Sequence, residues 1–224
     1  MSPDKVAELL REIELKDLST AAHTWRVVLY ARALCEAFGV DHDTIALVTQ
    51  GAALHDVGKL DVPDSILQKP DRLTKDEFEI IKIHPVSGYA RMIDLDVEED
   101  PILNLVRYHH ERWDGLGYPF NLKGEDIPLG ARFFAVIDSF DAMTSIRPYR
   151  QEIGEGAAEH ALQEIEKGSG NRYSPEAAEL FVELFRKGEL NHILHYFNDE
   201  SPVPEFHAAQ QAQVDKLAKR KTDG

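Results

Sequence analysis

Residues 109–119 read His-His-Glu-Arg-Trp-Asp-Gly-Leu-Gly-Tyr-Pro and combine side chains that could bind a metal ion. Adjacent histidines are costly to bury as packing residues, because each ring nitrogen then needs a partner. Glu111 and Asp114 follow, and two glycines open a turn closed by Tyr118-Pro119. The pattern indicates a helix that brings two imidazoles to one point and then breaks into a loop facing a substrate. The alternative is a helix end capped by histidines and followed by an ordinary Gly-Pro turn.

Three further segments place a histidine where a helix ends or faces inward. His55 and Asp56 close an apolar helix, which is costly unless both are bonded or hold a metal. The other interpretation is a carboxylate–histidine pair that only ties down the helix end. His84 precedes Pro85 at a predicted helix break, and His23 lies four residues before Val27 on an inward face. Taken singly, His84 could be a capping residue and His23 a core residue.

Asp138 lies within a strongly apolar helix, four residues after Phe134. A buried carboxylate there is costly unless it is paired or binds a metal. Imidazole and carboxylate ligands without thiolate fit Fe, Mn, Zn or Ni. The histidines and aspartates singled out above outnumber the ligands that one metal ion needs. Two ions could use all of them if one carboxylate bridges the two. The candidates are His23, His55, Asp56, His84, His109, His110 and Asp138.

Apolar periodicity predicts helices throughout, and no stretch shows sustained strand alternation. Ser19 is a plausible cap, Thr74 to Glu77 has the form of a capping box, and Pro101 suits the first turn of a helix. We therefore predict an all-α fold with the candidate ligands at helix ends. The expected helices cover about 3–15, 19–38, 43–57, 74–84, 100–110 and 129–144, with others after residue 150.

Composition limits the classes of partner. The chain has 224 residues and a formal net charge of −15, which disfavours nucleic acid and anionic membrane surfaces. Cys35 is the only cysteine, so no intrachain disulfide is possible. There is no signal segment and no apolar run of the roughly 20 residues that span a bilayer. We expect a cytoplasmic protein; its oligomeric state does not follow from the sequence.

The linked motifs resemble the HD-GYP domain, a branch of the HD phosphohydrolases. The resemblance rests on His55-Asp56-Val57-Gly58-Lys59, on the 109–119 stretch, and on Asp138, Asp141-Ala142 and 147–150, Arg-Pro-Tyr-Arg. It implies an all-helical HD-type bundle with two or three metal ions, often iron and sometimes manganese. It also implies hydrolysis of the bacterial signalling nucleotide cyclic di-GMP or a related cyclic dinucleotide.

The resemblance further implies roles for individual residues. One metal would be held by His23, His55, Asp56 and Asp138, and a second by Asp56, His84, His109 and His110, with Asp56 bridging. A hydroxide between the ions would attack phosphorus. Lys59 would meet the scissile phosphate, Arg147 and Arg150 would clamp the dinucleotide, and Tyr118 would lie at the pocket mouth. The 114–119 loop resembles a surface that contacts diguanylate cyclases in some relatives.

The resemblance also bears on metal count. Trinuclear members carry a Glu one turn before the first ligand histidine, where this chain has Ser19. A hydroxyl is a weak ligand for such cations, and Asp17 falls on another side of the helix. We expect two divalent ions, iron first and manganese next, with Ser19 as a cap. The product would be pGpG, hydrolysed further only slowly.

We expect an N-terminal helix at 1–18, the catalytic domain at 19–198 and a loosely ordered tail at 199–224, with no sensor domain ahead of Met1. Two other functions stay open at this point. One is a signalling module that binds cyclic dinucleotide or a partner protein with little turnover. The other is a phosphohydrolase for another nucleotide, such as cyclic GMP-AMP.

Overall fold

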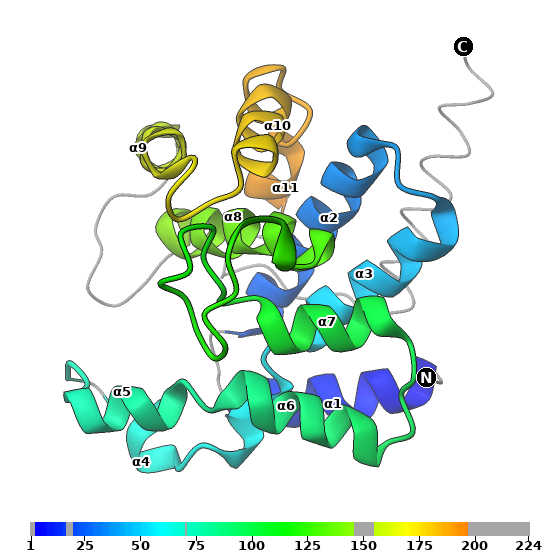
Figure 1. The fold of residues 1–224 in the computed structure, drawn as a ribbon, viewed down its shortest axis with the longest axis vertical. Coiled ribbons are helices and arrows are strands. Elements are labelled where there is room, and N and C mark those ends of the chain that lie inside the picture. The colour runs from blue at the N-terminus through cyan, green and yellow to red at the C-terminus, as the bar shows by residue number, and fades with distance from the viewer. Residues whose placement is uncertain (1–2, 17–19, 70, 146–154, 197–224) are drawn as a thin grey trace.

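The computed structural model describes residues 3–16, 20–69, 71–145 and 155–196, and its regular structure is helical (Figure 1). Within these ranges the one β-type pairing is an isolated bridge between Ser169 and Tyr173. The predicted all-α class is confirmed. None of the described helices is both long and apolar enough to cross a membrane. The helices are α1 (Pro3–Lys16), α2 (Thr20–Phe38), α3 (His42–Leu54), η1 (Val57–Asp61), α4 (Asp64–Leu67), α5 (Lys75–Ile81), α6 (His84–Asp94), α7 (Asp100–Tyr108), η2 (Gly124–Asp126), α8 (Leu129–Thr144), α9 (Glu155–Gly168), α10 (Pro175–Arg186) and α11 (Asn191–Tyr196).

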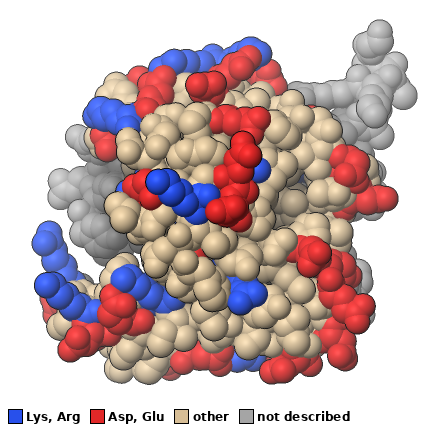
Figure 2. All heavy atoms as spheres, in the orientation of Figure 1, with Lys and Arg blue, Asp and Glu red and all other residues tan. Residues whose placement is uncertain are grey.

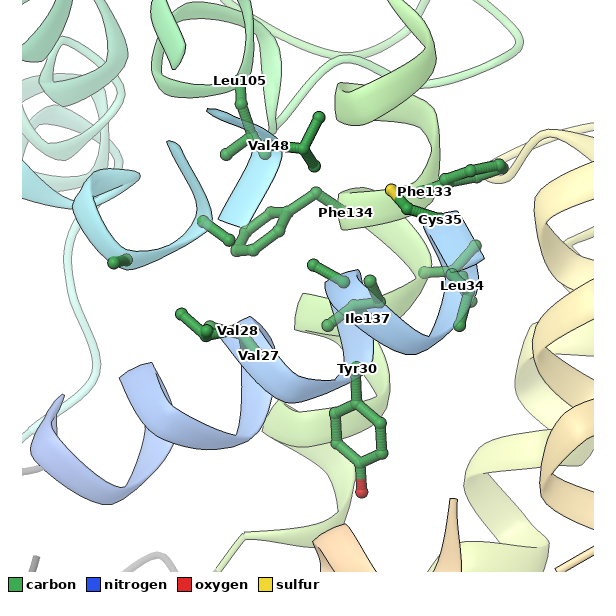
Figure 3. Packing of buried hydrophobic residues seen from close by; sticks show 14 of the residues in the cluster. Val27, Val28, Tyr30, Leu34, Cys35, Val48, Leu105, Phe133, Phe134 and Ile137 are labelled. Carbon is green, nitrogen blue, oxygen red and sulfur yellow. The ribbon is translucent and has the colours of Figure 1, made fainter. Parts of the chain in front are cut away.

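The core lies among α2, α3, α7 and α8, which pack against one another. Figure 3 shows Val48 of α3, Leu105 of α7 and Phe134 of α8 in this core, with Tyr30 of α2 farther along it. Leu105, Phe134 and Tyr30 are fully buried. Burial of one large apolar side chain contributes about 1.5–3 kcal/mol. This layer fixes the ends of the four helices, from which most candidate ligands project.

The first helix also belongs to this core. Val6, Leu9, Leu10 and Ile13 of α1 are buried, as their spacing predicts. Their helix packs on η1, α3 and α2. It therefore supports the segment that carries His55 and Asp56.

The helix predicted at 43–57 ends earlier than expected, at Leu54. Asp41 caps its start by accepting a hydrogen bond from the Thr44 amide at 2.9 Å. Asp56 leaves the helical conformation, with φ −93° and ψ 8°, and the tighter helix η1 follows. A Cβ on Gly58 would lie 1.9 Å from the carbonyl oxygen of His84, so η1 and α6 approach too closely for any other residue. This contact requires the early helix end.

The break predicted at His84 proved to be a boundary between two helices. The capping box at Thr74 is confirmed, and α5 ends at Ile81. A separate helix, α6, then begins at His84 with Pro85 in its first turn. The break was expected from the sequence, but this helix was not. The bounds of α8 and the start of α7 at Asp100 agree with expectation.

Candidate metal centre and active site

Three histidines from two helices meet in one group, in which His84 and His109 are buried and His110 is partly exposed. His84 begins α6, while His109 and His110 follow α7 directly. The Nε2 atoms of His84 and His109 are 3.1 Å apart, and the His109 and His110 ring centroids are 4.2 Å apart. Each of the three can offer a ligand atom within 4.8 Å of the others. The structure thus brings these three predicted ligands together.

A second group contains His23, His55 and Asp56, which also offer atoms within 4.8 Å of one another. The Nε2 atoms of His23 and His55 are 3.4 Å apart. Asp138 of α8 approaches this group, with its Oδ1 atom 3.7 Å from His23 Nε2.

Asp56 touches both groups with different oxygen atoms. Its Oδ2 atom lies 3.1 Å from His55 Nε2, and its Oδ1 atom lies 3.3 Å from His84 Nε2. The early end of α3 allows this, because adjacent residues of a continuous helix would point about 100° apart. The two groups therefore adjoin through one carboxylate.

The backbone determines which ring nitrogen each of three histidines presents. Nδ1 of His55 lies 2.8 Å from the Ala52 carbonyl oxygen, that of His84 2.8 Å from Ile81, and that of His109 3.0 Å from Val106. A carbonyl oxygen only accepts, so each Nδ1 carries a hydrogen, and in the neutral imidazole Nε2 then presents a lone pair. Such an outer hydrogen bond is usual for a metal-binding histidine.

This arrangement suits a cation. Lone pairs on His84 Nε2 and His109 Nε2 face each other at 3.1 Å, which is repulsive unless a positive charge lies between or beside them. His23 Nδ1 donates to Asp141 at 2.8 Å, so a neutral His23 also presents its Nε2 lone pair, 3.4 Å from His55 Nε2. The donor set of imidazole nitrogen and carboxylate oxygen fits a borderline divalent metal.

The electrostatics differ between the two groups. Burial lowers the pKa of His55, but the Asp56 carboxylate outweighs this and the net pKa is raised. A positive charge is therefore favoured beside Asp56. Burial, together with neighbouring imidazoles, holds the pKa of His109 well below its ordinary range and lowers that of His110 to about 3. These two imidazoles stay neutral and keep their lone pairs for a ligand.

His23 is oriented differently, by residues distant in sequence. Asp141 of α8 accepts from its Nδ1 and also forms a paired contact with Arg26, at 2.5 Å to Nε and 3.1 Å to Nη2. Burial opposes the charge of Asp141, but His23 and Arg26 depress its pKa overall. A buried carboxylate thus fixes the His23 tautomer and ties α2 to α8.

The loop after His110 is shaped by Glu111, which is 2% exposed. Its carboxylate accepts hydrogen bonds from the Phe120 amide at 2.7 Å and the Leu122 amide at 3.0 Å. A Cβ on Gly117 would lie 2.3 Å from the Arg112 nitrogen, so the loop folds back on its own start. The Tyr118–Pro119 bond is cis. This fold sets the Tyr118 ring beside His110, with centroids 4.7 Å apart.

The remaining predicted site residues lie as follows. Lys59 Nζ is 2.7 Å from Asp56 Oδ2, at the edge of the second group. Tyr118 is adjacent to His110, as described. Arg147, Arg150 and Ser19 lie outside the described residues.

The pairing of Asp141 with Arg26, which orients His23, was not predicted from the sequence. A signal was present, since Asp141 lies three residues after Asp138 in an apolar helix and Arg26 lies three after His23. The contact between the loop after His110 and the turn that joins α9 to α10 was not expected either; there the Asn171 and Arg172 carbonyls accept from the Asp114 and Trp113 amides.

Comparisons with known proteins concern the family and the fold. The HD domain family model matches residues 9–177. A cyclic di-GMP phosphodiesterase of Thermotoga maritima is 42% identical over 201 residues, which cover 88% of this chain and 52% of that protein. The cyclic di-GMP phosphodiesterase response regulator RpfG of Xanthomonas campestris pv. campestris is 35% identical over 202 residues, with 90% and 52% covered. The chain thus spans about half the length of these relatives.

A solved structure supports the fold. The structure of a cyclic GMP-AMP-specific phosphodiesterase of V. cholerae superposes with a TM-score of 0.63 at 16% identity, covering 85% of this chain and 50% of that one. At this identity the likeness concerns the fold alone. Together with the family match and the motifs at 55–59 and 109–119, these findings show that the chain belongs to the HD domain family, in its HD-GYP branch.

Proposed function

We propose that this chain is a metal-dependent phosphodiesterase that opens cyclic di-GMP to pGpG. The observation that carries the proposal is the pair of adjoining ligand groups, which share Asp56 and bring pairs of imidazole Nε2 atoms to 3.4 Å and 3.1 Å from each other. The relatives named cyclic di-GMP phosphodiesterases support the choice of substrate.

In this proposal His23, His55, Asp56 and Asp138 hold one divalent ion. Asp56, His84, His109 and His110 hold another, and iron or manganese are the metals expected. When bound, such ions acidify a water molecule and offset the charge that builds on phosphorus. Lys59, next to Asp56 at the edge of the site, binds a phosphate oxygen of the substrate. Tyr118 borders the substrate, and Arg147 and Arg150 clamp the dinucleotide.

The direct test is hydrolysis. Protein loaded anaerobically with Fe(II) or Mn(II) is incubated with cyclic di-GMP, cyclic GMP-AMP and pGpG, and the products are resolved by chromatography. We expect pGpG from cyclic di-GMP as the fastest reaction. No cleavage of cyclic di-GMP with either metal, alongside tight binding, would favour a binding module. Faster cleavage of cyclic GMP-AMP would overturn the substrate assignment.

Two variants separate metal binding from substrate contact. Asp56→Ala should lose metal and activity, because Asp56 reaches both ligand groups. Lys59→Ala should keep its metal and lose turnover by about 10²-fold or more, the usual cost of one charge-stabilising donor. Metal analysis and rates on the same samples check both. Unchanged metal content in Asp56→Ala would contradict the bridging role.

We also propose that the 114–119 loop contacts a protein partner, a diguanylate cyclase. Leu116 at its tip is 74% exposed, which is unusual for so apolar a side chain in an ordered loop. Leu116→Asp should weaken cyclase binding in a titration while hydrolysis remains. If the wild type and Leu116→Asp bind the cyclase with equal affinity, the proposed contact is wrong.

A further inference from the structure

The turn between α9 and α10 is docked on the loop that borders the site. The Trp113 amide donates to the Arg172 carbonyl at 3.3 Å, and the Asp114 amide donates to the Asn171 carbonyl at 2.7 Å. Figure 1 shows this turn, drawn in yellow, beside the green loop after α7. Residues about 60 positions apart in sequence therefore form one rim.

The backbone of this turn is closely defined. The Arg172 amide donates to the Gly168 carbonyl at 2.9 Å, and the Gly170 amide donates to the Tyr173 carbonyl at 2.9 Å. A Cβ on Gly168 would lie 2.7 Å from the Tyr173 ring, which is itself buried. The turn thus holds the Arg172 backbone in place while its side chain is exposed.

Arg172 lies beside the loop that follows His109 and His110, because its carbonyl accepts from the Trp113 amide. The Tyr118 phenol, next to His110, is within electrostatic range of Asp56, Asp138 and Arg172 together. Burial raises the pKa of Tyr118, and the two carboxylates add to this while the Arg172 guanidinium opposes it. The charge of Arg172 therefore acts on the same phenol as the two carboxylates of the ligand groups.

The Arg172 guanidinium makes no hydrogen bond or ion pair within the described part of the chain; its one ring contact is Tyr173, at 5.6 Å to the centroid. Three other cations near the site have carboxylate partners: Lys59 has Asp56, Lys82 has Glu79 at 2.6 Å, and Arg112 has Asp114 at 2.6 Å. Arg107 and Arg132 instead lie over the Phe120 and Trp113 rings of the loop. Figure 2 shows acidic side chains at several places on one face of the molecule, in keeping with the net charge of −15.

We propose that Arg172 is a substrate-contacting residue that binds the phosphate of the cyclic dinucleotide that is not being cleaved. The inference rests on the proposed function and deepens it. A cyclic dinucleotide carries two phosphates, and only one can lie at the ligand groups. A guanidinium binds a phosphate through two parallel hydrogen bonds, and a rigid rim loses little entropy in holding it there.

The test compares two phosphodiesters on the metal-loaded protein. Cyclic di-GMP has a second phosphate, whereas bis(4-nitrophenyl) phosphate has none. For Arg172→Ala we expect the ratio of kcat/KM for cyclic di-GMP to that for bis(4-nitrophenyl) phosphate to fall about tenfold, mainly through KM. Arg172→Lys, which keeps the charge, should recover part of the loss. Arg11→Ala, which removes an equal charge from the exposed face of α1, should leave the ratio unchanged.

The outcomes are separable. An unchanged ratio in Arg172→Ala, with wild-type cleavage of cyclic di-GMP intact, overturns the role of Arg172 alone. Equal losses on both substrates, with metal content reduced, would show that the turn only supports the site and would also overturn it. A wild-type protein that cleaves bis(4-nitrophenyl) phosphate but neither binds nor cleaves a cyclic dinucleotide would overturn the proposed function itself.

Discussion

Replacing Gly58 by alanine should disturb one ligand group. The added Cβ would lie 1.9 Å from the His84 carbonyl oxygen and 2.5 Å from the Gly88 amide nitrogen, both backbone atoms that no rotamer change can move. Reaching an ordinary contact of 3.4 Å requires η1 and α6 to separate by about 1.5 Å. Overpacking of this kind costs about 1–3 kcal/mol.

The same displacement alters the candidate metal centre. Asp56 Oδ1 and His84 Nε2 are 3.3 Å apart across this contact, while metal–ligand distances tolerate only about 0.2 Å. We therefore expect Gly58→Ala to bind fewer than two ions per chain, with the loss in the group of His84, His109 and His110.

Metal content by mass spectrometry and urea unfolding of the metal-free protein measure the two effects separately. Gly156→Ala is the matched control, because a Cβ at that helical glycine has no atom within 4 Å. Full metal content in Gly58→Ala, with a free energy of unfolding within about 0.5 kcal/mol of wild type, would refute the reasoning.

Three more changes test other parts of the site and its support. Asp141→Asn leaves buried Arg26 without its carboxylate and should lower the free energy of unfolding by about 3 kcal/mol at pH 7, measured by urea titration. Because the folded-state pKa of Asp141 is depressed, its stabilisation is present above the ordinary value of 3.8 and is lost below it, so the gap between variant and wild type should narrow as pH falls from about 5 to 2; a constant gap would contradict this. Glu111→Gln removes one of two acceptors for loop amides and should cost about 1–3 kcal/mol and speed proteolysis within 112–122; wild-type cleavage would argue against its role. Thr74→Ala removes the capping box of a helix without buried residues, so amide exchange in α5 should accelerate by about fivefold or more while global stability is unchanged; a global loss would show that α5 is part of the cooperative core.

Local rules predicted much of this fold. Caps at Thr74 and Pro101 and the apolar periodicity of α1 and α8 gave helix positions close to those observed. The candidate ligands were recognisable because histidine and aspartate are costly on apolar faces. The meeting of His84 with His109 follows from packing of α6 on α7, which no local pattern encodes.

The features that the sequence did not predict depend on tertiary contacts. Pro85 can end one helix or begin the next, so its presence alone did not reveal α6. The contact between Arg26 and Asp141 joins residues 115 positions apart. Each of the two was visible as a charge in an apolar helix, but their pairing depends on how α2 lies against α8.

The hydrogen bonds from His55, His84 and His109 to carbonyls three residues earlier have a consequence for evolutionary divergence. Each imidazole is oriented within its own turn of chain, so drift in the packing of α6 against α7 moves a ligand without changing the nitrogen it presents. His23 lacks this independence, since Asp141 belongs to another helix. Among divergent members of the family, the spacing between α2 and α8 should therefore vary less than that between α6 and α7.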